Sequence, residues 1–266
     1  MKAPVITLST DFGADSWYVG QMKGVILSIA PHARLVDLDH TIEPQNVLGA
    51  AFLLDYASVY FPNNTIHVCV VDPGVGTDRK VVAARTDKAF FVSPDNGTLS
   101  VVLARHEGVT AFEVTNTDLF LDNVSDTCHC RDVFAPLAAH LAAGCPINEV
   151  GPKLDEPYTI SWQTRRDEGG GIRGQVVRID RYGNLITNIL EEELLALKES
   201  KPGVLADTAI RVGGRRIETF VATYSDAGPG EPVFYIGSTG YVEIAESLGH
   251  AAERLKASVG DEVVCW

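Results

Sequence analysis

Residues 70–80 read VVDPGVGTDRK and carry two side chains that can do chemistry, Asp72 and Arg79. The apolar start of this stretch predicts a buried strand, and the proline and glycines that follow predict a turn. Such a turn is either an ordinary surface loop or the rim of an active site. A third chemical group, His129, stands in CHCRD (residues 128–132), a polar loop at the start of a predicted helix.

Further polar segments carry residues that could bind a ligand. In STDFG (residues 9–13), Asp11 lies just past the first predicted strand. It either closes the loop as an Asx turn or offers its carboxylate to sugar hydroxyls. In DRYGNLITN (residues 180–188), a predicted hairpin turn carries Asp180, Asn184 and Asn188. SPDNG (residues 93–97) is an ordinary turn sequence, and we interpret it as structural.

The elements that must position these residues alternate between strand and helix patterns through residue 164. This alternation predicts an α/β N-terminal domain with a mostly parallel sheet, whose ligands bind in the loops after the strands. The predicted strands are 4–10, 34–38, 66–71, 81–85, 89–92 and 110–114. The predicted helices are 17–29, 46–60, 99–105 and 133–143.

Beyond residue 164 the pattern changes to that of a second domain. The charged, glycine-rich residues 165–174 are interpreted as a linker between an N-terminal domain, 1–164, and a C-terminal domain, 175–266. One helix is predicted near 191–198. The predicted strands of this part are 175–179, 185–189, 210–212, 217–222, 233–236, 241–244 and 262–265. Strands of this length and spacing predict an antiparallel β-barrel-like domain.

Composition excludes several classes of function. The chain has 22 Lys and Arg against 35 Asp and Glu, and the formal charge of −13 argues against nucleic-acid binding. No apolar run approaches the ~20 residues of a membrane span, and the N-terminus is too polar for a signal peptide. Five scattered cysteines are an odd number, which favours reduced thiols. We therefore expect a cytoplasmic globular protein without nucleic-acid or membrane partners.

Two motifs suggest cofactors but fail in their context. Gly169, Gly171 and Gly174 match G-x-G-x-x-G, yet no predicted strand precedes them and a strand pattern, not a helix, follows. Cys128 and Cys130 flank His129, but the C-x-x-C spacing of zinc sites is missing. We expect neither a nucleotide cofactor nor a metal.

The polar segments become informative when they are taken in order. TDFG, VVDPGVGTDR, SPDNG, H-x-RD-x-FAP, D-x-x-GN-x-x-TN and IGSTGYVEIA (residues 236–245) together resemble the S-adenosyl-L-methionine (SAM) hydrolases, also called SAM hydroxide adenosyltransferases. That group shares its fold with the SAM-dependent fluorinase and chlorinase. The resemblance runs from Thr10 to about Leu255. It implies an N-terminal α/β domain, a C-terminal β-barrel, and a homotrimer with sites at subunit interfaces.

The resemblance also implies a reaction, SAM plus water giving adenosine and L-methionine, with SAM as substrate and no cofactor. The family's catalytic trio falls on Asp72, Arg79 and His129. Water attacking the ribose C5′ expels a neutral thioether, so the reaction needs a water held in line and a proton acceptor but no general acid. Asp72 could accept the proton, while Arg79 and His129 orient the water and stabilise its charge.

Further positions match residues that bind the substrate in the family. Asp11 matches the carboxylate that binds the ribose diol. Asp180, Asn184 and Ser238 match positions that hold the methionine end, where Asp180 would meet the α-ammonium. Adenine is expected to be held largely by backbone groups of the C-terminal domain. Asn188 is a further candidate for a substrate-binding residue.

A halogenase, a non-catalytic SAM or adenosine sensor, and a nucleoside-processing enzyme of different chemistry are the alternatives. In the fluorinase and chlorinase, tyrosine stands at the place of Asp72 and threonine at that of Val75, and the histidine corresponding to His129 is missing. A sensor would be expected to lose the trio and keep the ligand contacts. This chain keeps both. It departs from the hydrolase pattern at Cys128 and Cys130, where phenylalanine and glycine are usual, and a thiol there could make the site sensitive to oxidation.

Overall fold

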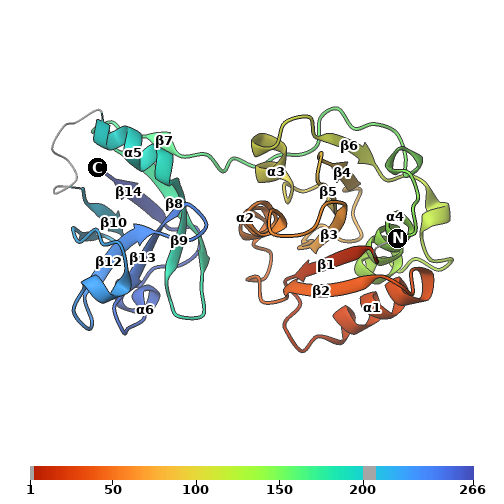
Figure 1. Ribbon diagram of the computed structural model, residues 1–266, viewed down its shortest axis with the longest axis horizontal. Coiled ribbons are helices and arrows are strands. Elements are labelled where there is room, and N and C mark those ends of the chain that lie inside the picture. Colours follow the sequence, from red (N-terminus) through yellow and green to blue (C-terminus); the bar gives the residue numbers. More distant parts are fainter. Residues whose placement is uncertain (1–2, 200–207) are drawn as a thin grey trace. The chain divides into compact units, whose positions relative to one another are not determined.

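The computed structural model describes residues 3–199 and 208–266, and it divides into two compact units, Met1–Ser161 (unit 1) and Trp162–Trp266 (unit 2) (Figure 1). No helix within these described residues is long and apolar enough to cross a bilayer. The change of pattern in the sequence predicts a boundary at residue 164, and the structure divides the chain after Ser161. Each unit has its own hydrophobic core.

The sheet of unit 1 has the strand order β2-β1-β3-β5-β4-β6. Its strands are β1 (Val5–Thr10), β2 (Arg34–Asp39), β3 (Thr65–Val70), β4 (Val81–Arg85), β5 (Ala89–Pro94) and β6 (Thr110–Glu113). Strands β2, β1, β3 and β5 run parallel, whereas β4 is antiparallel to both of its neighbours. All of β3 is buried, including Thr65 and His67 among its apolar residues, as is typical of a central parallel strand. The C-terminal ends of β1 and β3 therefore lie side by side at one edge of the sheet.

Helices cover both faces of this sheet (Figure 1). Helices α1 (Trp17–Ile29) and α4 (Ala135–Ala142) pack on one face, and α2 (Val47–Ser58) and α3 (Ser100–Arg105) on the other. Successive residues of β3 show this double cover, because Val68 belongs to the first core and Cys69 to the second.

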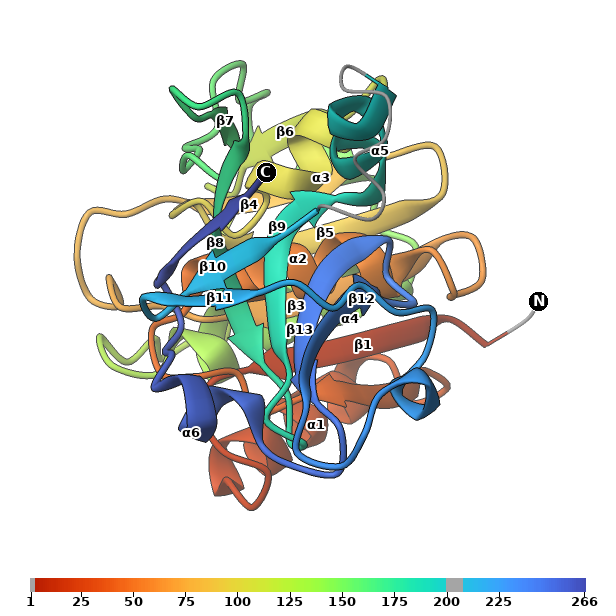
Figure 2. The same cartoon turned by 90° about the vertical axis from the view of Figure 1, so that its left-hand side faces the viewer.

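Unit 2 is built from antiparallel strands in the order β11-β10-β14-β8-β9-β13-β12 (Figure 2). The strands are β7 (Arg165–Arg166), β8 (Ile172–Ile179), β9 (Leu185–Leu190), β10 (Ile210–Val212), β11 (Arg215–Ile217), β12 (Pro232–Ile236), β13 (Tyr241–Glu246) and β14 (Glu262–Cys265). An isolated bridge between Phe220 and Phe234 joins the segment after β11 to β12, so the sheet curls into a nearly closed barrel. Helices α5 (Glu191–Glu199) and α6 (Ala251–Leu255) accompany it. The predicted fold class is confirmed for both units.

The segment predicted to be a linker, residues 165–174, differs from that prediction. It contains β7 and the first residues of β8, and Arg173 in it forms ion pairs with Asp167 and Glu262. The glycines that suggested a linker have a packing reason at Gly174, where a Cβ atom would lie 2.4 Å from Asn188 Oδ1. Glycine permits this close approach within the sheet.

The strand predicted over 217–222 also differs. Pairing starts directly after the Gly213-Gly214 turn, with Val212 opposite Arg215, so β11 covers Arg215–Ile217. Helix α6 was not predicted.

Candidate active site

Asp72, Arg79 and His129 form one hydrogen-bonded group in unit 1. Arg79 Nε donates to both carboxylate oxygens of Asp72 at 3.0 Å, and Arg79 Nη2 donates to Oδ2 at 2.5 Å. The same Nη2 lies 2.8 Å from Nδ1 of His129. The Asp72 and Arg79 side chains are only 5% and 10% exposed, so this ion pair is shielded from water. The structure thus brings the three predicted catalytic residues together.

The contact with Arg79 fixes the protonation of His129. A guanidinium carries only donors, so Nδ1 must accept, and the proton of the neutral imidazole is on Nε2. Burial and the charge of Arg79 lower the pKa of His129, while the carboxylates of Asp72, Asp126 and Asp132 oppose that shift. His129 therefore offers an N–H donor at Nε2 rather than a free base.

The loop that carries Asp72 and Arg79 is held at both ends by the turn after β5. Asp72 follows β3 by two residues, and the Asn96 side chain donates to the carbonyl of Val71 at 2.8 Å. At the other end, the backbone N–H of Asp95 donates to the carbonyl of Lys80 at 2.9 Å. The SPDNG turn, interpreted from the sequence as structural, therefore positions the proposed catalytic loop.

Close packing brings the His129 loop against this segment. Gly76 has φ +79, and a Cβ atom there would lie 2.8 Å from the carbonyl oxygen of Asp126, which only glycine tolerates. A π-helical turn, Cys130–Phe134, follows His129 and places the Phe134 ring 5.4 Å from the guanidinium carbon of Arg79. Turns of this kind are frequent at functional sites.

Asp132 has a structural part in the segment that precedes α4. It lies inside the π-helical turn, is fully buried, and accepts hydrogen bonds from Ser125 N at 2.9 Å and Arg131 Nε at 2.6 Å. Burial opposes the ionisation of Asp132, but these hydrogen bonds and the charge of Arg131 outweigh it and lower its pKa. Asp132 thus stays ionised and anchors the loop that leads to His129.

Asp11 lies at the same edge of the sheet as Asp72, because Thr10 of β1 pairs with Val70 of β3. Its Oδ2 accepts a hydrogen bond from the backbone N–H of Gln45 at 2.8 Å. Within the described part of the chain, the other carboxylate oxygen has no partner. The backbone N–H of Gly13 donates to the carbonyl of His40, so Asp11 does not close an Asx turn, and one of its oxygens is free for a ligand.

A hydrogen-bonded chain that sequence reasoning missed lies behind Asp11. The Thr10 hydroxyl lies 2.9 Å from Nδ1 of His40, and His40 Nε2 lies 3.1 Å from a carboxylate oxygen of Asp37, which also pairs with Lys23. A hydroxyl, an imidazole and a carboxylate in this order are the parts of a hydrolase triad. Here Thr10 is fully buried and beyond the reach of a substrate. The hydrogen bonds among Thr10, His40 and Asp37 therefore serve to fix the loop that carries Asp11.

Unit 2 contains a cavity of 870 Å³ that collects the other predicted binding residues. Its lining includes Asp180, Asn184 and Ser238. Asp180 Oδ1 accepts the backbone N–H groups of Tyr182 at 2.8 Å and Asn184 at 2.9 Å, and Oδ2 accepts the Asn184 side chain at 2.9 Å. The predicted hairpin turn therefore presents a carboxylate and an amide to one cavity.

Asn188 is not among the residues that line this cavity. Its side chain is buried and bridges the carbonyl of Trp162 at 2.6 Å and the backbone N–H of Gln175 at 2.7 Å. These contacts give Asn188 a structural role inside unit 2, next to Gly174.

Comparison with known families adds to this geometry. The family model described as the SAM hydroxide adenosyltransferase N-terminal domain matches residues 6–151, and the model for the C-terminal domain matches residues 174–264. The chain belongs to the SAM hydroxide adenosyltransferase family. The resemblance stated from the motifs is confirmed.

Similar proteins in this family extend over the whole chain. The (R)-S-adenosyl-L-methionine hydrolase of Salinispora tropica is 36% identical over 264 residues, covering 98% of this chain and 97% of the relative. A fluorinase from an Actinoplanes species is 32% identical over 290 residues, covering 97% and 95%. The crystal structure of an uncharacterized conserved protein from Thermotoga maritima matches with a TM-score of 0.88 at 38% identity, covering 98% and 99%.

The cysteines by which this chain departs from the hydrolase pattern are buried beside His129. Cys128 Sγ and Cys130 Sγ lie 3.5 Å apart and form no disulfide. Burial, together with the contact to Cys128, raises the pKa of Cys130 to about 12. A protonated, buried thiol reacts slowly, which argues against the sensitivity to oxidation expected from the sequence. Within the described residues, no group of three or more His, Cys, Asp or Glu side chains is arranged to hold a metal ion.

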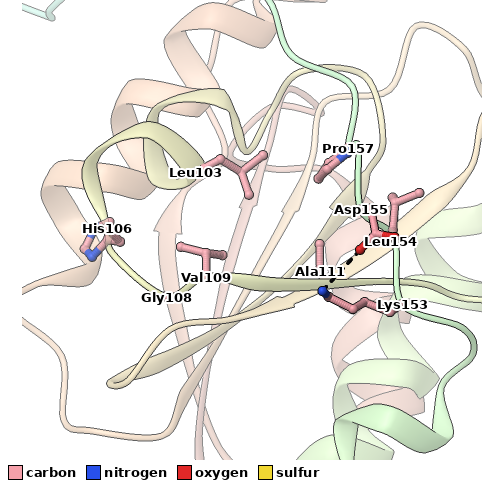
Figure 3. Close-up of a pocket in the computed structure, with 9 residues that line it drawn as sticks. All are labelled: Leu103, His106, Gly108, Val109, Ala111, Lys153, Leu154, Asp155 and Pro157. Carbon is pink, nitrogen blue, oxygen red and sulfur yellow. Dashed lines mark ion pairs between the residues drawn. The ribbon is translucent and has the colours of Figure 1, made fainter.

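A smaller hollow of 310 Å³ in unit 1 lies away from the family's motif residues (Figure 3). Leu103, Val109, Ala111 and Pro157 surround it, and an ion pair between Lys153 and Asp155 crosses its rim. Its lining includes none of the predicted site residues, so it takes no part in the candidate site.

Proposed function

We propose that this chain hydrolyses SAM to adenosine and L-methionine by in-line attack of water on the ribose C5′. The names of the hydrolase relatives support the reaction. The observation that carries the proposal for this chain is the hydrogen-bonded group of Asp72, Arg79 and His129.

The protonation pattern of that group suits a water nucleophile. His129 Nε2–H donates to one lone pair of the water and leaves the other to attack C5′. Asp72, held by Arg79, accepts a water proton as the O–C5′ bond forms and the C5′–S bond breaks. The bonding electrons go to sulfur, and methionine leaves as a neutral thioether, so no general acid is required. The proton passes from Asp72 to solvent after the reaction.

The charges of the group also favour water over a halide. Asp72 and Arg79 cancel, and His129 is neutral in the arrangement described. A halide beside the Asp72 carboxylate would be repelled, whereas water is not. The developing hydroxide and the sulfonium neutralise each other in the transition state, so shielding from solvent lowers the barrier.

Substrate binding is divided among the remaining residues. Asp11, with one free carboxylate oxygen, is proposed to accept hydrogen bonds from the ribose hydroxyls. Asp180, Asn184 and Ser238, which line the cavity of unit 2, are proposed to hold the methionine end. Neither role requires a metal or an organic cofactor.

A homotrimer with sites at subunit interfaces is part of the proposal. Exposed apolar side chains beside each group of binding residues support it. Trp17 is 73% exposed in an aromatic cluster with Tyr18 and Phe12, the neighbour of Asp11. Tyr182 and Leu248, which line the cavity of unit 2, are 77% and 92% exposed. Apolar surfaces of this kind are typical of surfaces that a partner covers.

The direct test is to incubate the purified protein with SAM and to separate the products by chromatography. Adenosine and L-methionine should appear in equal amounts, and activity should survive EDTA. Excess chloride or fluoride should yield only traces of 5′-halo-adenosine. A dominant halide product would assign the chain to the halogenases instead, and tight SAM binding without turnover would make it a sensor.

A further inference from the structure

The last residues of unit 1, 157–161, lead into unit 2 and form neither helix nor strand. We call them the connecting segment. Two of its backbone N–H groups bind side chains of unit 1. Tyr158 donates to Asp95 Oδ1 at 2.8 Å, and Ile160 donates to Ser100 Oγ at 2.9 Å. Asp95 belongs to the SPDNG turn after β5, and Ser100 begins the helix that follows this turn.

The connecting segment also packs closely on the turn itself. A Cβ atom at Gly97 would lie 2.6 Å from Cγ2 of Ile160, so the Ile160 side chain lies directly against the backbone of the turn. Together with the two hydrogen bonds, this contact docks the segment at three points, Asp95, Gly97 and Ser100. The turn that supports the proposed catalytic loop therefore supports the connecting segment as well.

Asp95 is the residue at which these two sets of contacts meet. Its carboxylate binds the connecting segment through Tyr158, and its backbone N–H donates to the carbonyl of Lys80 at 2.9 Å. Lys80 directly follows Arg79 of the proposed catalytic group. One residue thus joins the connecting segment to the end of the proposed catalytic loop.

The carboxylate of Asp95 is half-buried, which is costly for a charged group without a partner. Burial raises its pKa, the hydrogen bond from Tyr158 and the charge of Lys80 oppose that shift, and the charge of Glu113 adds to it. Lys80 pairs with Glu113 at 2.6 Å, so its charge is shared. The N–H of Tyr158 is therefore the direct donor that stabilises this carboxylate.

Little free chain remains between the connecting segment and the first anchor inside unit 2. Trp162 is the first residue of unit 2, and its buried side chain and a hydrogen bond from Asn188 to its carbonyl, at 2.6 Å, fix it there. Only Ser161 separates Trp162 from Ile160, the last anchor in unit 1. A displacement of Trp162 larger than one residue can absorb must therefore pull on the connecting segment.

We propose that Asp95 is a positioning residue for the proposed reaction, through which the docked connecting segment holds residues 71–80 in their active shape. The inference rests on the proposed function for the reaction that is measured. The connecting segment then supports catalysis as well as joining the two units.

Hydrogen exchange followed by mass spectrometry tests the link independently of activity. Asp95→Ala removes the acceptor for the N–H of Tyr158 but keeps the backbone hydrogen bond of residue 95 to the catalytic loop. The amides of residues 71–80 should then exchange about 2- to 10-fold faster, from the net worth of one hydrogen bond. Asp95→Asn keeps an acceptor oxygen and should bring exchange back to within about twofold of the parent.

Steady-state kinetics with SAM measures the consequence for the reaction. In Asp95→Ala, kcat should fall about 2- to 10-fold with KM nearly unchanged, because the loop carries the proposed catalytic residues and none of those proposed to bind substrate. Asp95→Asn should recover most of kcat. Asp261→Ala is the matched control, since Asp261 accepts the backbone N–H of Ser258 at the same 2.8 Å but lies in unit 2. It should leave kcat and the exchange of residues 71–80 unchanged.

Three outcomes would overturn the inference. The first is faster exchange in the connecting segment alone, with residues 71–80 unchanged. The second is faster exchange in residues 71–80 without a fall in kcat, and the third is an equal loss in Asp95→Ala and Asp95→Asn, which would mean that the acceptor oxygen does not matter.

Ile160→Ala loosens the connecting segment without altering the turn, because it removes the side chain that packs on Gly97. It should speed exchange in residues 71–80 and lower kcat, and it decides the question if Asp95→Ala does not fold. If the parent protein fails to turn over SAM, the proposed function is wrong, whereas the exchange rates still decide whether Asp95 links the connecting segment to the loop.

Discussion

At the scale of single residues, the central feature is a guanidinium that serves two partners at once. Arg79 holds the carboxylate of Asp72 through Nε and Nη2, and the same Nη2 fixes the tautomer of His129. Asp72 and His129, the two partners of Arg79, therefore have opposite roles toward a water molecule. Asp72 can only accept a proton, and His129 Nε2 can only donate a hydrogen bond. A water between them would be oriented by both.

Replacing Asp72 by asparagine tests the proton acceptor. Asparagine keeps the shape and one acceptor for Arg79 but cannot take the water proton. We expect kcat for SAM hydrolysis to fall about 10²- to 10⁴-fold, with SAM still bound. Steady-state kinetics and calorimetry measure the two effects separately, and circular dichroism checks the fold. Loss of SAM binding with little change in kcat would make Asp72 a ligand contact.

The pH dependence tests the donor role of His129. Protonation of Nδ1 would break the contact with Arg79, so the active form is the neutral imidazole. Burial and Arg79 lower its pKa below 6.5, against the carboxylates of Asp72, Asp126 and Asp132. Activity should therefore persist as pH falls through 6.5 and decline only below it. The profile of kcat/KM against pH measures this, with His129→Ala as control. A decline centred above pH 6.5 in the parent that His129→Ala abolishes would contradict it.

Asp11→Ala should change KM, whereas Asp72→Asn should change kcat. If Asp11 binds the ribose hydroxyls, it contacts substrate, transition state and adenosine alike, so its loss raises KM and leaves kcat nearly intact. A hydrogen bond to a charged group is worth roughly 1.5–3 kcal/mol, so affinity should drop about 10- to 150-fold. Inhibition by adenosine measures the same loss. Unchanged adenosine affinity would leave Asp11 as a turn residue that only holds Gln45.

At the scale of elements, the proposed catalytic loop gains its shape from a neighbouring strand rather than from its own sequence. Residues 71–80 are fixed at their two ends by the turn after β5, through the Asn96 side chain and the Asp95 backbone. These two contacts tie the loop to the edge of the sheet. Rigid support of this kind keeps catalytic groups in place before the substrate binds.

Asn96→Asp tests this support. The carboxylate keeps the contacts to Thr98 but loses the donor to the Val71 carbonyl, which accepts from Asn96 at 2.8 Å. We expect kcat to fall about 2- to 10-fold with KM nearly unchanged, from the net worth of one hydrogen bond. Thr98→Val is the matched control, because it removes the Thr98 hydroxyl contact and leaves the Val71 contact. Equal defects in both variants would show that Asn96 only stabilises the turn.

The elements also show which features the sequence could predict. The places of Asp72 and Asp11 were predictable because a strand pattern ends just before each of them, and neighbouring parallel strands end at the same edge of the sheet. Arg79, His129 and the binding residues of unit 2 came from motif order. The contact of Asn96 with Val71 and that of Asp95 with Lys80 depend on strand pairing between distant residues. No local pattern encodes these tertiary contacts, and the glycines of residues 165–174 suggested a linker because their close packing was not visible.

At the scale of the whole molecule, the residues of the proposed site are divided between two independently packed units. Unit 1 holds the proposed catalytic group and Asp11, and unit 2 holds the cavity with Asp180 that is proposed to bind the methionine end. Exposed apolar side chains stand beside both sets, with Trp17 in unit 1 and Leu248 in unit 2. If the protein forms the proposed homotrimer with sites at subunit interfaces, two different copies of the chain would supply these two sets.

Mixing two inactive variants tests this arrangement. Asp72→Asn disables only the unit 1 contribution, and Asp180→Asn only that of unit 2. If each site takes its two sets from different subunits, hybrid trimers contain some sites in which both sets are intact. Random assembly of equal amounts should then restore about a quarter of the parent activity, since each intact set is present with a chance of one half. Co-expression with two affinity tags yields the hybrids, and sedimentation confirms their size. If each chain forms its own site, every site keeps one defect and the mixture stays as inactive as the separate variants.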